Sequence, residues 1–227
     1  MKTEQWADRT GIDLYVSILE AEFGYSSGLR LAVAHAAGST GRGAHEAERQ
    51  LAAAFPARRR AEFLAGREAL HRALGRAGLD SGPVLRDGPR PRLPAGVRAS
   101  ISHSQGVAVA LAGPAARYRT LGVDIELCGP PTAAAHLVLN RGERHLFDRS
   151  APDAADQLLA LYSAKEAAFK ALSPLLEPEE LPGLRAVRLT PRQDGWQAAP
   201  VARPGLRVAV SVRRLGAGVL GWALPAD

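Results

Sequence analysis

Two carboxylates separated by one residue, Asp124 and Glu126, are the first feature of this sequence that suggests chemistry. On a β-strand over 121–126 they would share one face, while Val123 and Ile125 would face the core. Two carboxylates side by side repel each other unless a cation neutralises them, and hard cations prefer oxygen ligands. The pattern therefore indicates a cation site. The alternative, which an isolated Asp-x-Glu favours, is a strand whose outer face is acidic and solvated.

The segment 162–170, Tyr-Ser-Ala-Lys-Glu-Ala-Ala-Phe-Lys, carries a second group of charged side chains. On a helix, Glu166 and Lys170 are four residues apart and share a face. The alternative is a surface ion pair, which contributes only about 0.3–0.5 kcal/mol. Of 29 lysines and arginines, however, only Lys2, Lys165 and Lys170 are lysine. Because lysine is a compact ammonium that can lose a proton, we expect a chemical reason for the two lysines in this helix.

A third feature is a histidine between hydroxyls, Ser-Ile-Ser-His-Ser at 100–104, at the end of an expected strand. Ser102 and His103 could donate hydrogen bonds to a phosphate group. The alternative is that His103 is a structural residue, as a lone histidine commonly is. The two residues do not form a hydrolase pair by themselves, because neighbouring residues of a strand point to opposite faces.

The arginine-rich segment 58–67 has helical periodicity, with Phe63, Leu70 and Arg67 on one stripe. An arginine on the inward side of a helix needs an anion, and Gly66 beside it would let a ligand or another backbone approach closely. The alternatives are that the Arg67 side chain extends along its stem to solvent, or that it pairs with a nearby acid.

Hydrophobic periodicity predicts the elements that position these residues. Helices are expected over 44–55, 58–77, 133–139 and 153–172. The last of these begins after an apparent capping signal, Ser150 to Asp153. Strands are expected over 12–18, 29–33, 97–101, 107–111, 121–126, 184–189, 206–212 and 219–224, with a C-terminal antiparallel meander around Trp196. The stretch 113–119 is the expected hinge between two lobes.

Composition bounds the class of protein. With 46% hydrophobic and 23% charged residues, the 227-residue chain is globular and long enough to bury a core. A single cysteine, Cys128, excludes an intramolecular disulfide framework and a cysteine-rich zinc site. The first residues do not follow the pattern of a signal peptide, and the longest apolar stretch, 106–116, is too short to span a bilayer. We therefore expect a soluble, cytoplasmic protein without a membrane partner. Its net charge of +6 suits a polyanionic partner.

Four motifs in this order resemble those of the Sfp/EntD-type 4′-phosphopantetheinyl transferases. They are Arg-Ala-Glu-Phe-Leu-Ala-Gly-Arg at 60–67, Ser-Ile-Ser-His-Ser at 100–104, Gly-Val-Asp-Ile-Glu at 122–126, and the segment 162–170. Each motif alone is weak, but four in the family's order and spacing make the resemblance specific. The chain departs from the family where Pro91-Arg92-Leu93-Pro94 replaces a Trp-Pro and where Tyr162 replaces Trp or Phe.

The resemblance implies an α+β fold of two similar α/β lobes related by a pseudo-twofold axis, with the active site in the cleft between them. The N-terminal lobe, 1–115, would hold the nucleotide side of coenzyme A with the arginine-rich helix and the Ser-His strand. The C-terminal lobe, 116–227, would supply the metal carboxylates, the Lys-Glu helix and the meander. Because both lobes lie in one chain, a monomer is expected.

The resemblance also implies the catalytic and metal-binding residues. Asp124, Glu126 and Glu166 would hold Mg²⁺, with Mn²⁺ as an alternative, and oxygen ligands suit both cations. Lys170 would neutralise charge at the reacting phosphate or protonate the leaving 3′,5′-ADP. His103 would contact the pyrophosphate and belongs with Glu166 and Lys170 in the implied catalytic set.

Further contacts with coenzyme A are implied for both lobes. Ser102 would join His103 at the pyrophosphate, and Lys165 would bind coenzyme A together with Lys170. Arg60, Arg67 and Arg90 would lie on the adenosine and 3′-phosphate side.

The implied reaction is attack of a serine hydroxyl, on an apo acyl, peptidyl or aryl carrier protein, at the β-phosphate of coenzyme A. The 4′-phosphopantetheine arm would move to the serine, with Glu166 or a metal-bound water that it orients as the base. The pathway served would be polyketide, nonribosomal peptide or siderophore synthesis.

Two other classes of function compete with this reading. A metal-dependent phosphoesterase or nuclease could use the same carboxylates and lysine, but water would be its acceptor. A nucleic-acid-binding module would need a concentrated basic face with stacking aromatics. Aromatics are only 5% of this chain and its arginines are interleaved with acids, so no nucleic-acid partner is expected.

Overall fold

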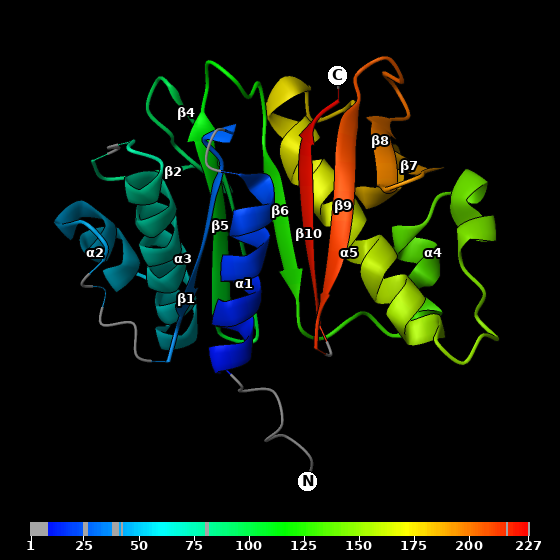
Figure 1. Cartoon of the computed structure of the whole chain (residues 1–227), viewed down its shortest axis with the longest axis horizontal. Helices are drawn as coiled ribbons and strands as arrows, with labels where there is room; N and C mark the ends of the chain where they lie inside the picture. The colour runs from blue at the N-terminus through cyan, green and yellow to red at the C-terminus, as the bar shows by residue number, and fades with distance from the viewer. Residues whose placement is uncertain are drawn as a thin grey trace, which may run out of the picture. The chain divides into compact units, whose positions relative to one another are not determined.

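The computed structural model describes residues 9–24, 27–37, 41, 43–79, 82–216 and 218–226. Its helices and antiparallel sheets confirm the expected α+β class (Figure 1). The chain divides into two compact units, Met1–Arg119 (unit 1) and Thr120–Asp227 (unit 2), so that the division falls at the end of the expected hinge. Within the described ranges, no helix combines the length and apolar character needed to cross a membrane.

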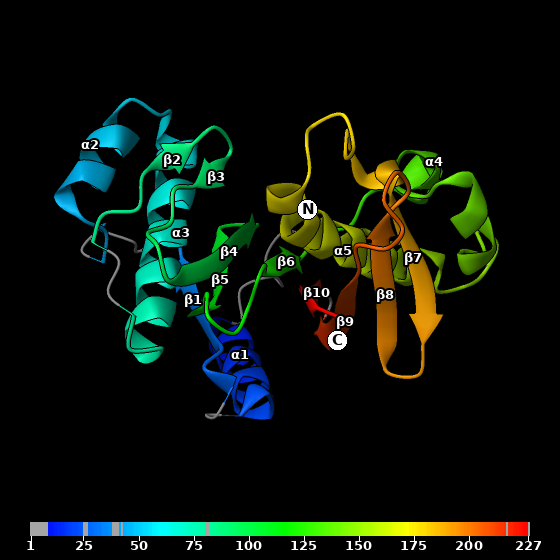
Figure 2. The same ribbon diagram turned by 90° about the horizontal axis from the view of Figure 1, so that it is seen from above.

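Unit 1 is built on a three-stranded antiparallel sheet in the order β1-β5-β4. Its strands are β1 (Arg30–His35), β4 (Val97–Ser104) and β5 (Val107–Pro114). The long helix α3 (Ala57–Arg76) packs on this sheet through small residues, because alanines of α3 meet alanines of β1 and β5 in the core. The helix α2 (Glu46–Ala53) packs on α3. The hairpin of β2 (Arg86–Asp87) and β3 (Arg90–Pro91) lies beside α3 (Figure 2).

The strand expected over 12–18 is wrong, since these residues lie within the helix α1 (Arg9–Phe23). Ile12, Val16 and Leu19 are buried and recur at intervals of four and three residues, which is a helical period. Leu14 and Ile18, which an alternating strand would place on the same face as Ile12 and Val16, are exposed. The β-branched residues suggested a strand, but packing of one helical stripe against β1 determined the structure.

Unit 2 is built on a five-stranded antiparallel sheet in the order β6-β10-β9-β8-β7, which confirms the expected meander. Its strands are β6 (Gly122–Glu126), β7 (Val187–Arg192), β8 (Gly195–Pro200), β9 (Val208–Leu215) and β10 (Gly218–Pro225). The helix α5 (Ala154–Leu172) lies across one face of the sheet and contacts all five strands (Figure 1). Leu158, Leu161 and Leu172 of α5 lie in the core of this unit.

Three local predictions in unit 2 need correction. The α5 helix begins at Ala154 after Asp153, whose side chain makes no capping bond, and Ser150 donates instead to Asp148 Oδ1 at 2.6 Å. The expected strand over 184–189 begins with a 3₁₀ turn, η5 (Leu184–Ala186). The expected helix over 133–139 is one turn of 3₁₀ helix, η2 (Thr132–Ala134), followed by one turn of α-helix, α4 (Ala135–Val138). Two further 3₁₀ turns are η3 (Arg141–Leu146) and η4 (Ser173–Leu175).

Glycines on β6 and β10 allow α5 to approach the sheet closely. A Cβ at Gly122 would overlap the carbonyl oxygen of Ala167, and one at Gly221 would lie 2.8 Å from Ser163 Oγ. Gly122, Asp124 and Glu126 occupy alternate positions of β6 and share its face. The missing side chain at Gly122 therefore determines how near α5 lies to the two carboxylates.

We predict that Gly122→Ala lowers the free energy of unfolding by about 3 kcal/mol, the upper part of the range for overpacked sites, because a helix backbone must move. Urea unfolding followed by fluorescence measures this, since Trp196 and Trp222 both lie in unit 2. Gly183→Ala is the control, because a Cβ at Gly183 would meet nothing within 4 Å. Equal stability of the two variants would contradict the close approach.

Candidate active site

The helix α5 packs on β6 and buries Asp124, whereas Glu126 at the end of the strand is partly exposed. Asp124 is only 1% exposed. Lys170 of α5 donates from Nζ to Asp124 Oδ1 at 2.7 Å and to the Val123 carbonyl oxygen at 3.1 Å. The alternative of an acidic, solvent-facing strand is therefore wrong for Asp124. The sequence analysis did not predict this ion pair between Lys170 of the second motif and Asp124 of β6.

The negative charge of Asp124 also acts on Glu166 of α5. Burial is the main cause that raises its pKa above the ordinary value, and the charge of Asp124 adds to it. Lys170 and a hydrogen bond with Tyr162 act in the opposite direction but do not cancel the rise. The pKa of Tyr162 is raised by burial first and then by Glu166, Glu126 and Asp124. The negative charges of all three carboxylates therefore act on the same phenol of α5.

The donor set of this carboxylate cluster (Asp124, Glu126 and Glu166) fits a hard divalent cation. All donors are oxygens, and Lys170 supplies one positive charge against three negative ones. Within the residues that the structure describes, no three His, Cys, Asp or Glu side chains stand close enough together to hold a metal ion. Asp124 is turned to Lys170 and Glu166 to Tyr162, so the chemistry of the cluster suits a cation although its present side-chain positions do not enclose one.

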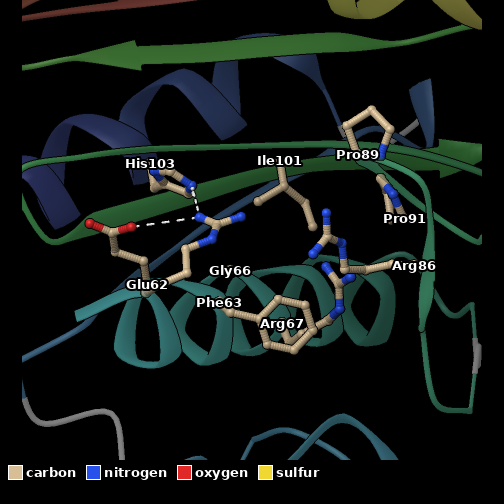
Figure 3. A pocket seen from close by; sticks show the side chains of 10 residues that line it. Glu62, Phe63, Gly66, Arg67, Arg86, Pro89, Pro91, Ile101 and His103 are labelled. Carbon is tan, nitrogen blue, oxygen red and sulfur yellow. Dashed lines mark hydrogen bonds and ion pairs between the residues drawn. The ribbon is translucent and has the colours of Figure 1, made fainter. Parts of the chain in front are cut away.

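Unit 1 contains a basic pocket of about 110 Å³, several times the roughly 30 Å³ that one water molecule occupies (Figure 3). Three elements line it: α3, the β2–β3 hairpin and β4. Its residues are Arg59, Glu62, Phe63, Gly66, Arg67, Arg86, Pro89, Pro91, Ile101 and His103. Figure 3 shows the guanidinium groups of Arg67 and Arg86 close to one another, with Ile101 and His103 reaching in from β4.

Arg67 is the buried arginine of this pocket. Its Nε donates to the Val84 carbonyl oxygen at 2.7 Å, Nη2 donates to that of Leu85 at 3.3 Å, and its guanidinium lies 4.4 Å from the centre of the Phe63 ring. Burial is the main cause that lowers the pKa of Arg67 to about 10; Glu48 opposes this, while Arg86 and Arg59 lower the pKa further. Cations that disfavour each other in a partly desolvated pocket make a binding site for an anion.

The predicted residues of unit 1 separate into two groups. Arg67 and His103 line the basic pocket, and Arg59 Nη1 lies 2.8 Å from His103 Nε2. Arg60 donates instead to the carbonyl oxygens of Ala53 and Phe55 near the end of α2, and neither Arg90 nor Ser102 lines the pocket. Ser102 is buried on the other face of β4 from His103 because neighbouring strand residues alternate.

Two arginines that line the pocket were not predicted from the sequence, and Gly66 makes a contact that was not expected. Arg59 lies four residues before Phe63 and eight before Arg67, so the helical stripe could have identified it. Arg86 comes from the hairpin, which gave no periodic signal. Gly66 lines the pocket, and it also admits the side chain of Ile101 of β4, whose Cγ2 would lie 3.2 Å from an added Cβ.

Lys165 has a structural setting that differs from the predicted contact with coenzyme A. Its side chain is fully buried and pairs with Glu143, which is also buried. Glu143 in addition accepts from the backbone N–H groups of Leu189 at 2.6 Å and Asn140 at 2.9 Å. Burial lowers the pKa of Lys165, and Glu143 opposes the change. The compact ammonium of lysine thus closes a buried ion pair.

Comparisons with known proteins agree with both halves of this picture. A family model described as the 4′-phosphopantetheinyl transferase N-terminal domain matches residues 46–113. A second, described as the 4′-phosphopantetheinyl transferase superfamily, matches residues 120–214. The 4′-phosphopantetheinyl transferase PptT of Mycobacterium tuberculosis is 31% identical over 160 residues, which cover 69% of this chain and 70% of that protein. The chain therefore belongs to the 4′-phosphopantetheinyl transferase superfamily and is of the Sfp/EntD type.

Two other relatives are similar over shorter segments. The 4′-phosphopantetheinyl transferase Svp of Streptomyces mobaraensis is 41% identical over 121 residues, 50% of this chain and 48% of that protein. Enterobactin synthase component D of Salmonella typhi is 34% identical over 136 residues, 59% of this chain and 55% of that protein. The chain thus spans about half the length of these two relatives.

We predict that Lys165→Met lowers the free energy of unfolding by about 3–5 kcal/mol, because it leaves the Glu143 carboxylate buried without its cation. The control, Arg214→Met, removes a half-exposed pair with Asp156 and should cost less than about 1 kcal/mol. Urea unfolding of both variants checks the difference. A Lys165→Met protein as stable as the control would show that Lys165 has no structural role in unit 2.

Proposed function

We propose that this protein transfers the 4′-phosphopantetheine arm of coenzyme A to a serine of a carrier protein and releases 3′,5′-ADP. The observation that carries the proposal is the carboxylate cluster of β6 and α5, with Lys170 beside Asp124. Family membership supports the same reaction. The basic pocket of unit 1 adds a binding site for an anionic group, as a phosphate-rich substrate requires.

In this proposal Asp124, Glu126 and Glu166 would hold Mg²⁺, or Mn²⁺ in its place, for the reaction at the pyrophosphate of coenzyme A. The cation, when bound, neutralises the three carboxylates and withdraws charge from the phosphate oxygens. Burial is the main cause that raises the pKa of Glu166, and the charge of Asp124 adds to it; a cation bound beside both carboxylates would favour their charged forms, which supports this assignment.

The serine hydroxyl of the carrier attacks the β-phosphorus of coenzyme A, a new serine Oγ–phosphorus bond forms, and the bond to the oxygen of 3′,5′-ADP breaks. Glu166, or a water that it orients, takes the hydroxyl proton. Lys170 neutralises the charge that develops on the phosphate or donates a proton to the leaving group. Positioning and charge stabilisation supply most of the acceleration.

The basic pocket takes a phosphate of the nucleotide half of coenzyme A. Arg67 and His103 were expected there from the resemblance, and Arg59 and Arg86 join them because they line the same pocket. With a volume of about 110 Å³, the pocket accommodates one phosphate group rather than the whole nucleotide. A contact with coenzyme A is supported by the resemblance alone for Arg60, Arg90 and Ser102.

The proposed partner is an acidic apo acyl or peptidyl carrier protein, and the pathway is polyketide, nonribosomal peptide or siderophore synthesis. A relative named enterobactin synthase component D supports the siderophore branch. The excess of positive charge on this chain would favour encounter with an acidic carrier. We further propose that the protein acts as a monomer in the cytoplasm and binds neither nucleic acid nor membranes.

The test is intact-protein mass spectrometry of fatty-acid, polyketide and peptidyl apo-carriers after incubation with coenzyme A and Mg²⁺. We predict that at least one carrier gains the mass of one phosphopantetheine arm. Asp124→Asn should reduce the rate at least about a hundredfold, because it removes the negative charge that pairs with Lys170 and that would help to hold the cation. The control Asp156→Asn, at an exposed ion pair of the same unit, should retain full activity.

The same experiment separates transfer from hydrolysis. Consumption of coenzyme A without any carrier would favour a phosphoesterase, and no mass gain on any carrier would contradict the proposed transfer.

A further inference from the structure

Glu48 of α2 is a buried carboxylate that takes no part in the proposed reaction. It is 0% exposed and accepts hydrogen bonds from the backbone N–H groups of His45 and Val84, both at 2.7 Å. His71 Nε2 of α3 lies 2.9 and 3.0 Å from its two oxygens, and Arg67 Nε lies 3.8 Å from Oε1. One side chain thus joins the start of α2, the middle of α3 and the segment before the β2–β3 hairpin.

The contacts of Glu48 lead directly to the basic pocket. The N–H of Val84 donates to Glu48, while the carbonyl oxygen of the same residue accepts from Arg67 Nε. The carbonyl oxygen of Leu85 accepts from Nη2 of that guanidinium, and Leu85 is followed by Arg86. Glu48 therefore holds the backbone that fixes Arg67 and from which Arg86 extends. Figure 3 shows these two arginines close to one another.

The charge of Glu48 matters as well as its shape. Burial acts to raise its pKa, but the hydrogen bonds from His71, Val84 and His45 together outweigh burial and leave the pKa below the ordinary value. Glu48 is therefore an anion at neutral pH, and it favours the charged form of Arg67 against burial and the two neighbouring arginines. An uncharged residue at this position would leave the pocket with less well-stabilised positive charge.

Unit 2 contains the same arrangement. Glu143 is the third residue of η3, as Glu48 is of α2, and each belongs to a capping box. Glu143 accepts from the backbone N–H of the residue that caps η3 and from one distant backbone N–H, and it pairs with a cation of the long helix α5. The cations correspond in sequence: Arg67 is followed by Glu68 and five residues on by Arg72, and Lys165 by Glu166 and Lys170. Arg72 and Lys170 donate to the carbonyl oxygens of Val33 and Val123.

The repeated arrangement differs in what its cation faces. Lys165 is sealed from solvent, whereas Arg67 lines a pocket. We propose that Glu48 is a positioning residue, which holds Arg67 and the 84–86 segment so that the basic pocket binds the phosphate monoester of a nucleotide. The assignment of that ligand to coenzyme A rests on the proposed function. The role of Glu48 in positioning the anion-binding pocket rests on the contacts in unit 1.

The test compares Glu48→Gln, which keeps the shape but removes the charge, with Glu46→Gln, the same change at an exposed acid of the same helix. Calorimetric titration with 3′,5′-ADP should show binding weakened about tenfold in Glu48→Gln and unchanged in Glu46→Gln. In carrier modification the KM for coenzyme A should rise by a similar factor, while kcat at saturating coenzyme A stays within about twofold. A role in stability alone would lower the thermal midpoint without this split.

His71→Asn is the second variant, because His71 is partly exposed and its loss is better tolerated than a change at Glu48. It should weaken 3′,5′-ADP binding about threefold with kcat retained. Unchanged affinity in folded Glu48→Gln, or in His71→Asn where Glu48→Gln does not fold, would overturn the proposal. If the wild-type protein binds neither 3′,5′-ADP nor coenzyme A, the proposed function of the pocket fails instead.

Discussion

The buried carboxylate of Asp124, held against α5 by Lys170, is the interaction on which the organisation of unit 2 depends. A charge that is almost fully removed from water is stable only with a close counter-charge, and Lys170 provides one at 2.7 Å. This contact requires α5 to lie directly on β6, which the missing side chain of Gly122 permits. The same approach brings Glu166, one turn before Lys170, into the field of Asp124. Close packing and excess negative charge therefore have a common cause.

Each unit contains a buried glutamate, Glu48 or Glu143, that pairs with a cation of the long helix of that unit. Glu48 and Glu143 each bind a backbone N–H at the start of their own turn, a distant backbone N–H and a cation of the long helix. The cations are arginine in unit 1, where a pocket is open to an anion, and lysine in unit 2, where the pair is closed. The presence of Lys165 and Lys170 in an arginine-rich chain thus has a local explanation. Lys165 fits a buried slot, and Lys170 reaches a carboxylate and a carbonyl at once.

Much of the fold followed from sequence periodicity, because α3, α5 and the strands of the C-terminal meander each bury one regular stripe or face. The helix α1 did not, since its β-branched residues obscured a helical stripe of Ile12, Val16 and Leu19. In the site, the strand alternation identified Asp124, and the lysine count drew attention to Lys170. The pairing of Lys165 with Glu143 and of Arg67 with Glu48 joins residues about twenty positions apart. Such contacts depend on tertiary packing and leave no periodic trace in the sequence.

The central claim is that the carboxylates of β6 and α5 hold one divalent cation. It is tested most directly by titrating Mn²⁺ and following the free ion by electron paramagnetic resonance, with coenzyme A at one fixed concentration in every sample. We predict one Mn²⁺ per chain above the coenzyme A blank, displaced by Mg²⁺ and lost in Asp124→Asn although that variant is folded by circular dichroism. Wild-type protein that binds no Mn²⁺ above the blank, or Asp124→Asn that binds as much as wild type, would contradict it.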